Sequence, residues 1–393
     1  MYGIMIAKSR GKCLRVDDKV FRGRKGEIMK NKFKSTILIT AMAASVLTGC
    51  SLGYSDSFDS DESLMGYSNG KVGVSMPAQE LQRWNQDGSN IQAGLEAAGY
   101  VVNLQYASND TETQIAQVES MIDSDCELLV IAAVDGDSLS EVLAPAREKG
   151  IPVIAYDRLI KNSDAVSYYA TFDNYLIGIK QGEYIRDKLN LDNAAGPFYM
   201  EIVAGDSADN NARYFYDGSM DVLQPYIDEG KLVVKSGQID FETVTTPKWS
   251  TQDAQDRMDA ILSEYYADGT DLDAVLCASD SVALGAENSL EADYMGPWPI
   301  ITGQDCDIVN IKNMIAGKQS MSIFKDTRIL ASKTVEMVNA IMHGGEPPVN
   351  DTESYDNGTG AVPAYLCEPE VADGDNYKKL LIDSGYYNES DLQ

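Results

Sequence analysis

From residue 71 onward, short apolar runs alternate with amphipathic segments, and this alternation restricts the fold more than any other feature of the sequence. The apolar run 128–134 shows no alternation, which indicates a strand buried on both faces. The segment 112–122 instead carries its apolar residues at helical spacing. The order of these elements is strands at 71–77, 100–107, 128–134 and 152–156, with helices at 80–98, 112–122 and 139–149 between them. A β-α-β series of this kind predicts an open parallel sheet covered by helices.

A second series of the same type follows. It contains strands at 197–204, 231–236, 274–278, 300–303 and 320–324, with helices near 174–189, 211–224, 251–266, 281–293 and 307–316. A last helix is expected over 327–342, ahead of Gly344 and Gly345. We therefore predict the α/β class, with two doubly wound parallel-sheet, Rossmann-like lobes.

The first 50 residues differ sharply in charge from the rest. They hold 11 Lys/Arg and 3 Asp/Glu, a net charge of +8, within a 393-residue chain of net charge −29, so residues 51–393 carry −37. Three lysines precede an apolar stretch, 37–47, which has the length of a signal-peptide core and is too short to span a bilayer. The stretch ends at Leu47-Thr48-Gly49-Cys50, which resembles a bacterial lipobox; the alternative is a short buried helix with an incidental cysteine.

The lipobox resemblance implies that the chain is cut before Cys50 and that the Cys50 thiol is diacylated. We accordingly interpret 29–49 as a lipoprotein signal peptide. The Ser-, Asp- and Gly-rich segment 50–69 is interpreted as a flexible tether. Because a complete signal peptide begins at Met29, residues 1–28 are interpreted as an extension upstream of the true translation start.

Composition argues against several classes of function. The acidic body does not suit nucleic acid as the main partner. The single histidine, His343, argues against Ser-His-Asp catalysis and histidine-based zinc sites, and no Cys-x-x-Cys pair is present, so we expect neither enzyme activity, metal nor cofactor. Pairing among the four cysteines that remain after processing stays open: Cys126, Cys277, Cys306 and Cys367.

Polar and aromatic residues follow the predicted strands at their carboxyl ends, where ligands bind in parallel sheets. The candidate ligand-binding residues are Arg83, Trp84, Asp157, Arg158, Asp209, Asn210, Asn211, Trp249, Ser279, Asp280, Asp305 and Lys325. Planar Asp, Asn and Arg groups can bridge adjacent hydroxyls, and tryptophan faces pack on the C–H patches of a pyranose ring. The balance of acids and bases favours a neutral polyhydroxylated ligand. Simpler roles exist for single members: Asp280 as a helix cap, Arg158 as a solvated residue, and the tryptophans as core residues.

Several stretches resemble one family: Arg83-Trp84, 151–160 (IPVIAYDRLI), 168–174 (YYATFDN), 205–220, 226–238, 301–307 (ITGQDCD) and 322–328 (SIFKDTR). Together they are similar to periplasmic monosaccharide-binding proteins of ABC transporters, in the D-xylose-binding and multiple-sugar-binding receptor group, which have the type I periplasmic binding protein fold. The resemblance implies that Arg83, Asp157, Arg158 and Asn211 bond sugar hydroxyls, that Trp84 and Trp249 sandwich the ring, and that Asp305 and Lys325 hold its far side. Xylose-binding relatives have asparagine at the position of Ser279, which leaves the preferred sugar open.

The resemblance also implies a three-stranded hinge, with crossings expected near 171–174, 325–328 and 348–352. The N-terminal lobe would then comprise 70–172 and 327–349, and the C-terminal lobe 173–326 and 350–393. We expect a lipid-anchored, extracytoplasmic monomer that captures an aldose such as xylose, glucose, galactose or arabinose and delivers it to an ABC transporter permease. The alternative is a sugar-sensing subunit that presents the sugar to a membrane sensor kinase or chemoreceptor.

Overall fold

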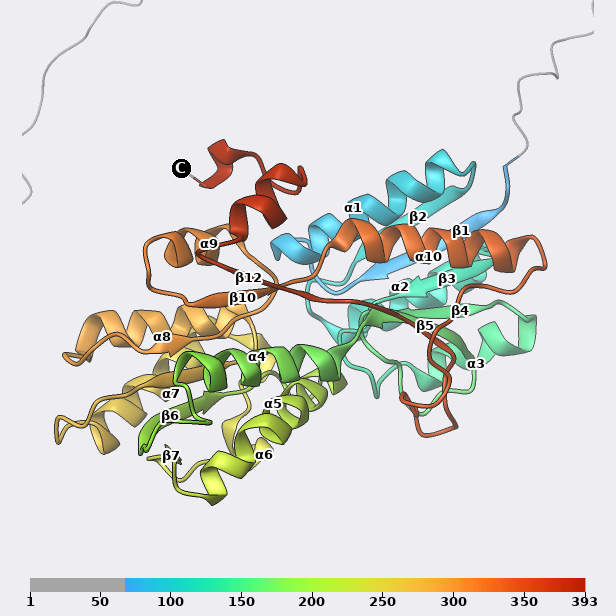
Figure 1. Ribbon diagram of the computed structural model, residues 1–393. Coiled ribbons are helices and arrows are strands. Elements are labelled where there is room, and N and C mark those ends of the chain that lie inside the picture. Colours follow the sequence, from blue (N-terminus) through green and yellow to red (C-terminus); the bar gives the residue numbers. More distant parts are fainter. Residues whose placement is uncertain (1–67, 393) are drawn as a thin grey trace, which may run out of the picture. The chain divides into compact units, whose positions relative to one another are not determined.

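The computed structural model describes residues 68–392, coloured in Figure 1 from blue to red. The sequence predictions for 1–28, for the signal peptide 29–49, for Cys50 and for all but the last two residues of the tether lie outside the described residues. Within 68–392, no helix is both long and apolar enough to cross a membrane.

The first lobe is built on a parallel sheet of six strands in the order β11-β5-β4-β3-β1-β2. The strands are β1 (Lys71–Met76), β2 (Val101–Tyr106), β3 (Leu128–Ile131), β4 (Val153–Tyr156), β5 (Val166–Phe172) and β11 (Ala364–Cys367). β3 and β4 are buried along their whole length, as expected for central strands covered on both faces.

Helices cover both faces of this sheet. α1 (Gln82–Ala97) and α10 (Thr327–Met342) lie side by side on one face and bury Ile91, Leu95 and Met337 against it. α2 (Thr111–Asp123) and α3 (Ser140–Lys149) pack Val118, Met121 and Leu143 on the other. Asp110 caps the start of α2, and its carboxylate accepts a hydrogen bond from the Thr113 amide at 2.8 Å.

The second lobe repeats the plan around the parallel order β7-β6-β8-β9. Its strands are β6 (Phe198–Val203), β7 (Leu232–Val234), β8 (Ala274–Cys277) and β9 (Ile300–Ile301), and a bridge from Gln304 to Ile323 adds β10 (Met321–Phe324) to the edge. β12 (Glu370–Asp373) pairs antiparallel with β10. The helices are α4 (Asn174–Lys188), α5 (Asn210–Asp228), α6 (Phe241–Val244), η1 (Pro247–Trp249), α7 (Thr251–Tyr265), α8 (Asp280–Asp293) and α9 (Ile308–Ile315).

The prediction of two doubly wound parallel-sheet lobes is confirmed. The chain crosses between them at Asp173, after β5, and at Lys325-Asp326, after β10. Both crossings end in an aspartate that caps the next helix: Asp173 accepts from the Leu176 amide at 2.9 Å, and Asp326 accepts from the Arg328 amide at 3.0 Å. Each crossing is therefore short and closed by a rigid helix start.

The third crossing lies later than predicted. β11 pairs with β5 in the first sheet, from Ala364 with Tyr169 to Cys367 with Phe172. β12, which begins at Glu370, belongs to the second lobe. The chain therefore changes lobes at 368–369, and the boundary predicted between 349 and 350 is wrong. Residues 350–367 stay with the first lobe because β11, which leads into the third crossing, pairs with β5, which leads into the first.

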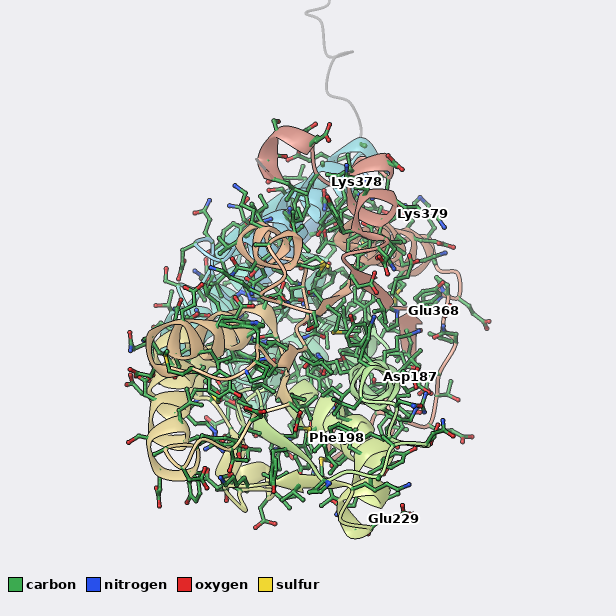
Figure 2. The ribbon with its side chains drawn as sticks, turned by 60° about the vertical axis from the view of Figure 1, so that its left-hand side comes forward. Asp187, Phe198, Glu229, Glu368, Lys378 and Lys379 are labelled. Carbon is green, nitrogen blue, oxygen red and sulfur yellow. The ribbon has the colours of Figure 1, made fainter. Side chains whose placement is uncertain are left out.

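After β12 the chain forms a C-terminal segment, residues 376–392, that contains η2 (Lys378–Asp383) and η3 (Glu389–Leu392). Figure 1 shows this segment in red beside α9 and near the start of α1. Lys378 and Lys379 lie exposed on its outer side, and Glu229 lies at the opposite end of the second lobe (Figure 2).

The cysteines of the described chain are all buried and unpaired, at positions 126, 277, 306 and 367. Burial raises the pKa of the Cys277 and Cys306 thiols well above the usual range and that of Cys367 to about 12. The thiols therefore stay protonated and behave as small apolar core groups.

Candidate ligand-binding site

A cleft lies where the carboxyl ends of strands from both lobes face each other. Its empty volume is about 630 Å³, open solvent included. Among the predicted residues, those that line it are Arg83, Trp84, Asp157, Asp209, Asn211, Trp249, Ser279, Asp305 and Lys325. Parallel strands of both sheets thus bring together side chains that are up to 242 positions apart in the chain.

Arg83, on the first turn of α1, is the centre of the charge network. Its guanidinium donates to Asp87 Oδ2 at 3.1 Å, to Asp157, and across the cleft to Asp305 Oδ1 at 3.4 Å. Burial opposes the charged form, yet Asp157 and Asp87 raise the pKa of Arg83 well above its usual value. Arg83 therefore stays cationic although it is largely removed from water.

Lys325 places a second cation at the hinge, immediately after β10. Its Nζ lies 2.9 Å from Asp305 Oδ1, and the residue is only 3% exposed. Asp305 thus links Lys325 to Arg83 and joins the two lobes through one carboxylate. Burial alone would raise the pKa of the Asp157 carboxyl, but Arg83 and Lys325 hold it below its usual value.

Asp157 is held by its backbone as well as by its charge. Its φ is 60°, in the left-handed region, where a non-glycine residue needs compensating contacts. The carbonyl oxygen of Asp157 accepts from Tyr169 Oη at 2.6 Å, Thr171 Oγ1 at 3.0 Å and Asn211 Nδ2 at 2.7 Å. Because Asn211 belongs to the second lobe, its amide also joins the lobes.

Arg158 supports the cleft from behind. Its Nη1 donates to the carbonyls of Ala133 and Val134 at 3.1 and 3.2 Å, and its Nε lies 3.0 Å from Asp209 Oδ2 as an ion pair. Its guanidinium also lies 5.1 Å from the centre of the Trp84 ring, and that of Arg83 lies 5.0 Å from it. Two cations on one indole fix the plane of Trp84.

Trp249 supplies the aromatic surface of the second lobe. Lys248 and Trp249 have φ of 54° and 56°, so η1 turns sharply and carries the indole into the cleft. The ring lies against Gly205, where an added Cβ would come within 1.9 Å of Cη2, and it meets Phe215 edge-on at 6.3 Å. Gly205 is therefore required for this close approach.

Two buried polar atoms of the cleft lining have no hydrogen-bond partner among the described residues. One is the donor Nε1 of Trp249, and the other is the acceptor Oε1 of Gln304. Buried polar groups are otherwise nearly always paired, so such atoms point to a ligand that can both donate and accept.

Three predicted residues lie outside the cleft lining. Arg158 lies behind it, as described. Asn210 is the first residue of α5 and does not line the cleft. Asp280 is fully buried and accepts from the Asp307 amide at 2.8 Å, Gln319 Nε2 at 2.7 Å and Ser322 Oγ at 2.9 Å, so it ties the ends of β8, β9 and β10 together.

The cap role considered for Asp280 is also not observed, because Asp280 is the first residue of α8 and the cap position is held by Ser279. The Ser279 side chain accepts no hydrogen bond from the helix start. Ser279 Oγ instead lies 2.9 Å from Ser281 Oγ on the cleft wall. Burial and the adjacent Asp307 raise the pKa of Asp280 well above its usual value.

Several lining residues are not among the predicted candidates: Leu81, Gln82, Phe215, Ser281, Gln304 and Asp307. Gln304 and Asp307 flank the predicted Asp305 on the loop after β9, so proximity to that strand end was the available signal. Burial, followed by Asp305, raises the pKa of Asp307 to about 7. Phe215 lies inside α5, and its helical spacing is equally compatible with a core position.

Comparisons with known proteins agree with this geometry. Residues 72–346 match the family described as periplasmic binding protein domain. The multiple sugar-binding periplasmic receptor ChvE of Rhizobium radiobacter is 48% identical over 92% of this chain and 100% of its own length. The D-xylose-binding periplasmic protein of Escherichia coli is 33% identical over 82% of this chain and 92% of its own.

Solved structures give the same result. An ABC transporter solute-binding protein from Clostridium phytofermentans with bound β-D-glucose is 68% identical, with a TM-score of 0.81 over 82% of this chain and 100% of its own. A carbohydrate transporter solute-binding protein from Chloroflexus aurantiacus in complex with D-glucose is 32% identical, with a TM-score of 0.75 over 81% of this chain and 97% of its own.

The relatives are binding proteins and receptors, which confirms the prediction of a binding protein rather than an enzyme. The fold, the cleft between the lobes and these similarities together place the chain in the periplasmic binding protein family, in the group of sugar-binding receptors of ABC transporters.

Proposed function

We propose that this protein captures a single aldose, with D-glucose as the first candidate, by closing its two lobes on the sugar, and delivers it to an ABC transporter permease. The observation that carries the proposal is the composition of the cleft. Paired charges from both lobes lie beside two indoles, and the lining holds one unpartnered donor, Trp249 Nε1, and one unpartnered acceptor, Gln304 Oε1.

This composition suits a neutral sugar better than an ion. Each sugar hydroxyl both donates and accepts, so it can satisfy Trp249 Nε1 and Gln304 Oε1, or bridge neighbouring oxygens of Asp157 and nitrogens of Arg83. The cations and carboxylates are already paired, so an ionic ligand would leave one partner uncompensated in a largely dry cleft. The indoles of Trp84 and Trp249 offer faces for the C–H side of the ring.

The relatives support the choice of ligand. Two similar structures are described with bound D-glucose, and other relatives are named for multiple sugars or D-xylose. We further propose that the protein acts as a monomer outside the cytoplasm and is anchored by lipid at Cys50. The lipobox-like Leu47-Thr48-Gly49-Cys50 supports the anchor.

Titration calorimetry of the purified protein against D-glucose, D-xylose, D-galactose and L-arabinose tests the sugar proposal. We expect at least one aldose to bind and to raise the melting temperature, with stabilisation of about 2.7 kcal/mol at a hundredfold excess over Kd. Asp157→Ala should abolish binding while the ligand-free fold persists. Asp164→Ala, which removes an exposed carboxylate paired with Arg147, should bind as the wild type does.

Failure of every aldose to bind, or normal binding by Asp157→Ala, would reject this assignment. Delivery to a membrane sensor remains the alternative for the later step. Binding assays with the purified permease and with a sensor domain, each with and without sugar, separate the two recipients.

A further inference from the structure

The C-terminal segment, residues 376–392, contacts both lobes at the edge of the cleft. Leu381 and Tyr387 are buried in a core of the second lobe with Cys306, Ile311 and Phe324. The segment is therefore fixed to the second lobe by packing. Its two adjacent tyrosines, 386 and 387, then reach α1 of the first lobe, the helix that carries Arg83 and Trp84.

Tyr387 forms a hydrogen-bonded link from lobe to lobe. Its hydroxyl accepts from Gln82 Nε2 at 2.7 Å and donates to the carbonyl of Cys306 at 3.0 Å. Gln82 precedes Arg83 directly, and Cys306 follows Asp305, so the link runs parallel to the 3.4 Å contact between Arg83 and Asp305. The residue is only 6% exposed, which shields these bonds from water.

Tyr386 makes a second link beside the hinge. Its hydroxyl donates to Gln86 Oε1 at 3.0 Å and lies 3.3 Å from Thr327 Oγ1, immediately after the crossing at Lys325-Asp326. Its ring meets Phe324 edge-on at 4.8 Å, and the Arg328 guanidinium lies 5.0 Å from the ring centre. Tyr386 thus touches α1, the end of β10 and the start of α10 together.

We infer that Tyr386 and Tyr387 are positioning residues of the ligand site, which hold α1 against the second lobe and so stabilise the closed arrangement of the cleft. The inference rests on the proposed function, since it assigns the C-terminal segment a part in retaining the sugar. Neither tyrosine lines the cleft. Both act through Gln82 and Gln86, one turn apart on α1, the helix whose first turn also carries Arg83.

Tyr386→Phe and Tyr387→Phe test this inference, because each removes a hydroxyl and keeps the packed ring. Loss of one net hydrogen bond across the lobes should speed release of D-glucose about three- to tenfold. Release is measured by stopped-flow fluorescence of the cleft tryptophans. Tyr216→Phe is the matched control, since its hydroxyl bonds to the Ile239 carbonyl within the second lobe.

Small-angle scattering of the ligand-free proteins gives a second readout, which does not depend on sugar. We expect a larger radius of gyration for the double variant than for the wild type and Tyr216→Phe, with melting temperatures of the single variants close to that of the control. Release rates equal to those of Tyr216→Phe would overturn the inference. If the wild type binds none of the aldoses, the proposed function fails. The inference is then judged by scattering alone, and a double variant with the same radius of gyration as the wild type would overturn it.

Discussion

Arg83 is the residue on which most cleft contacts depend, because three carboxylates share its guanidinium: Asp87, Asp157 and Asp305. Removing one partner of a buried ion pair leaves an uncompensated charge. We expect Arg83→Met to lower the free energy of unfolding by about 3–5 kcal/mol and to abolish sugar binding. Denaturant titration and calorimetry measure the two effects.

Arg147→Met is the control for this prediction. The Arg147–Asp164 pair lies on the surface, with side chains 61% and 54% exposed, so its loss should cost under about 1 kcal/mol. Equal destabilisation by the two substitutions would show that Arg83 does not act through buried pairing.

Glu287, on α8, gives a pH prediction that is independent of the cleft. Burial raises its pKa from 4.5 to about 7, and Oε1 has no partner among the described residues. Between those pH values the unfolded state loses the proton first, so this group makes the fold less stable as pH rises from about 4.5 to about 7. Above pH 7 its contribution is constant.

Between pH 4.5 and pH 8, Glu287 should cost the wild type up to about 3 kcal/mol of unfolding free energy. Glu287→Gln should not show this loss. Denaturant titrations at both pH values measure the difference. Glu291→Gln removes a half-exposed carboxylate on the same helix, which adds only the smallest contribution to the raised pKa of Glu287, so it should change the pH dependence much less. A parallel response of the two variants would contradict the role given to burial.

At the residue scale, the strand-end rule found most of the cleft. It located Asp157, Asp305 and Lys325 because parallel strands deliver whatever follows them to one edge. It misplaced Asn210 and Asp280 because adjacency in sequence does not fix the direction of a side chain at a helix start. Asp280 turns inward, where Gln319 and Ser322 satisfy its carboxylate.

Among the elements, the loop after β6 offers a direct test of Trp249. A Cβ at Gly205 would overlap the indole, so Gly205→Ala should displace the ring and weaken sugar binding at least about tenfold, since the lost face is one of two aromatic surfaces. Calorimetry measures the affinity. Gly374→Ala, where an added Cβ meets nothing within 4 Å, should bind sugar as the wild type does.

Helices were easier to predict than strands. The expected range 327–342 coincides with α10, because a helix satisfies its hydrogen bonds locally and its apolar spacing is visible in sequence. β5, β11 and β12 were not predicted as strands. Residues 364–367 form β11 by pairing with residues 169–172, almost 200 positions earlier. The local sequence around 364–367 does not indicate such a distant partner.

For the whole molecule, sequence predicted two lobes and the first two crossings, which the aspartate caps at Asp173 and Asp326 mark. The third crossing was predicted too early, near 348–352, because its position depends on where β11 pairs. The role of the C-terminal segment was equally hidden, since Tyr386 and Tyr387 meet α1 from about 300 positions away.

The internal pairing of the cleft charges has a consequence for the whole molecule. Each of the three cations, Arg83, Arg158 and Lys325, already has a carboxylate partner, so none needs a charged ligand for compensation. Dissolved ions then have little to screen. We expect the Kd for D-glucose to change less than about twofold between 20 and 500 mM NaCl in calorimetry, and a steep salt dependence would contradict this balance.

Such a site separates recognition from the strongly acidic exterior that surrounds it. The surface potential weakens as the salt concentration rises, but the affinity for an uncharged ligand should not change with it. A binding protein with such a site is expected to keep nearly the same affinity for its sugar at low and at high salt concentration.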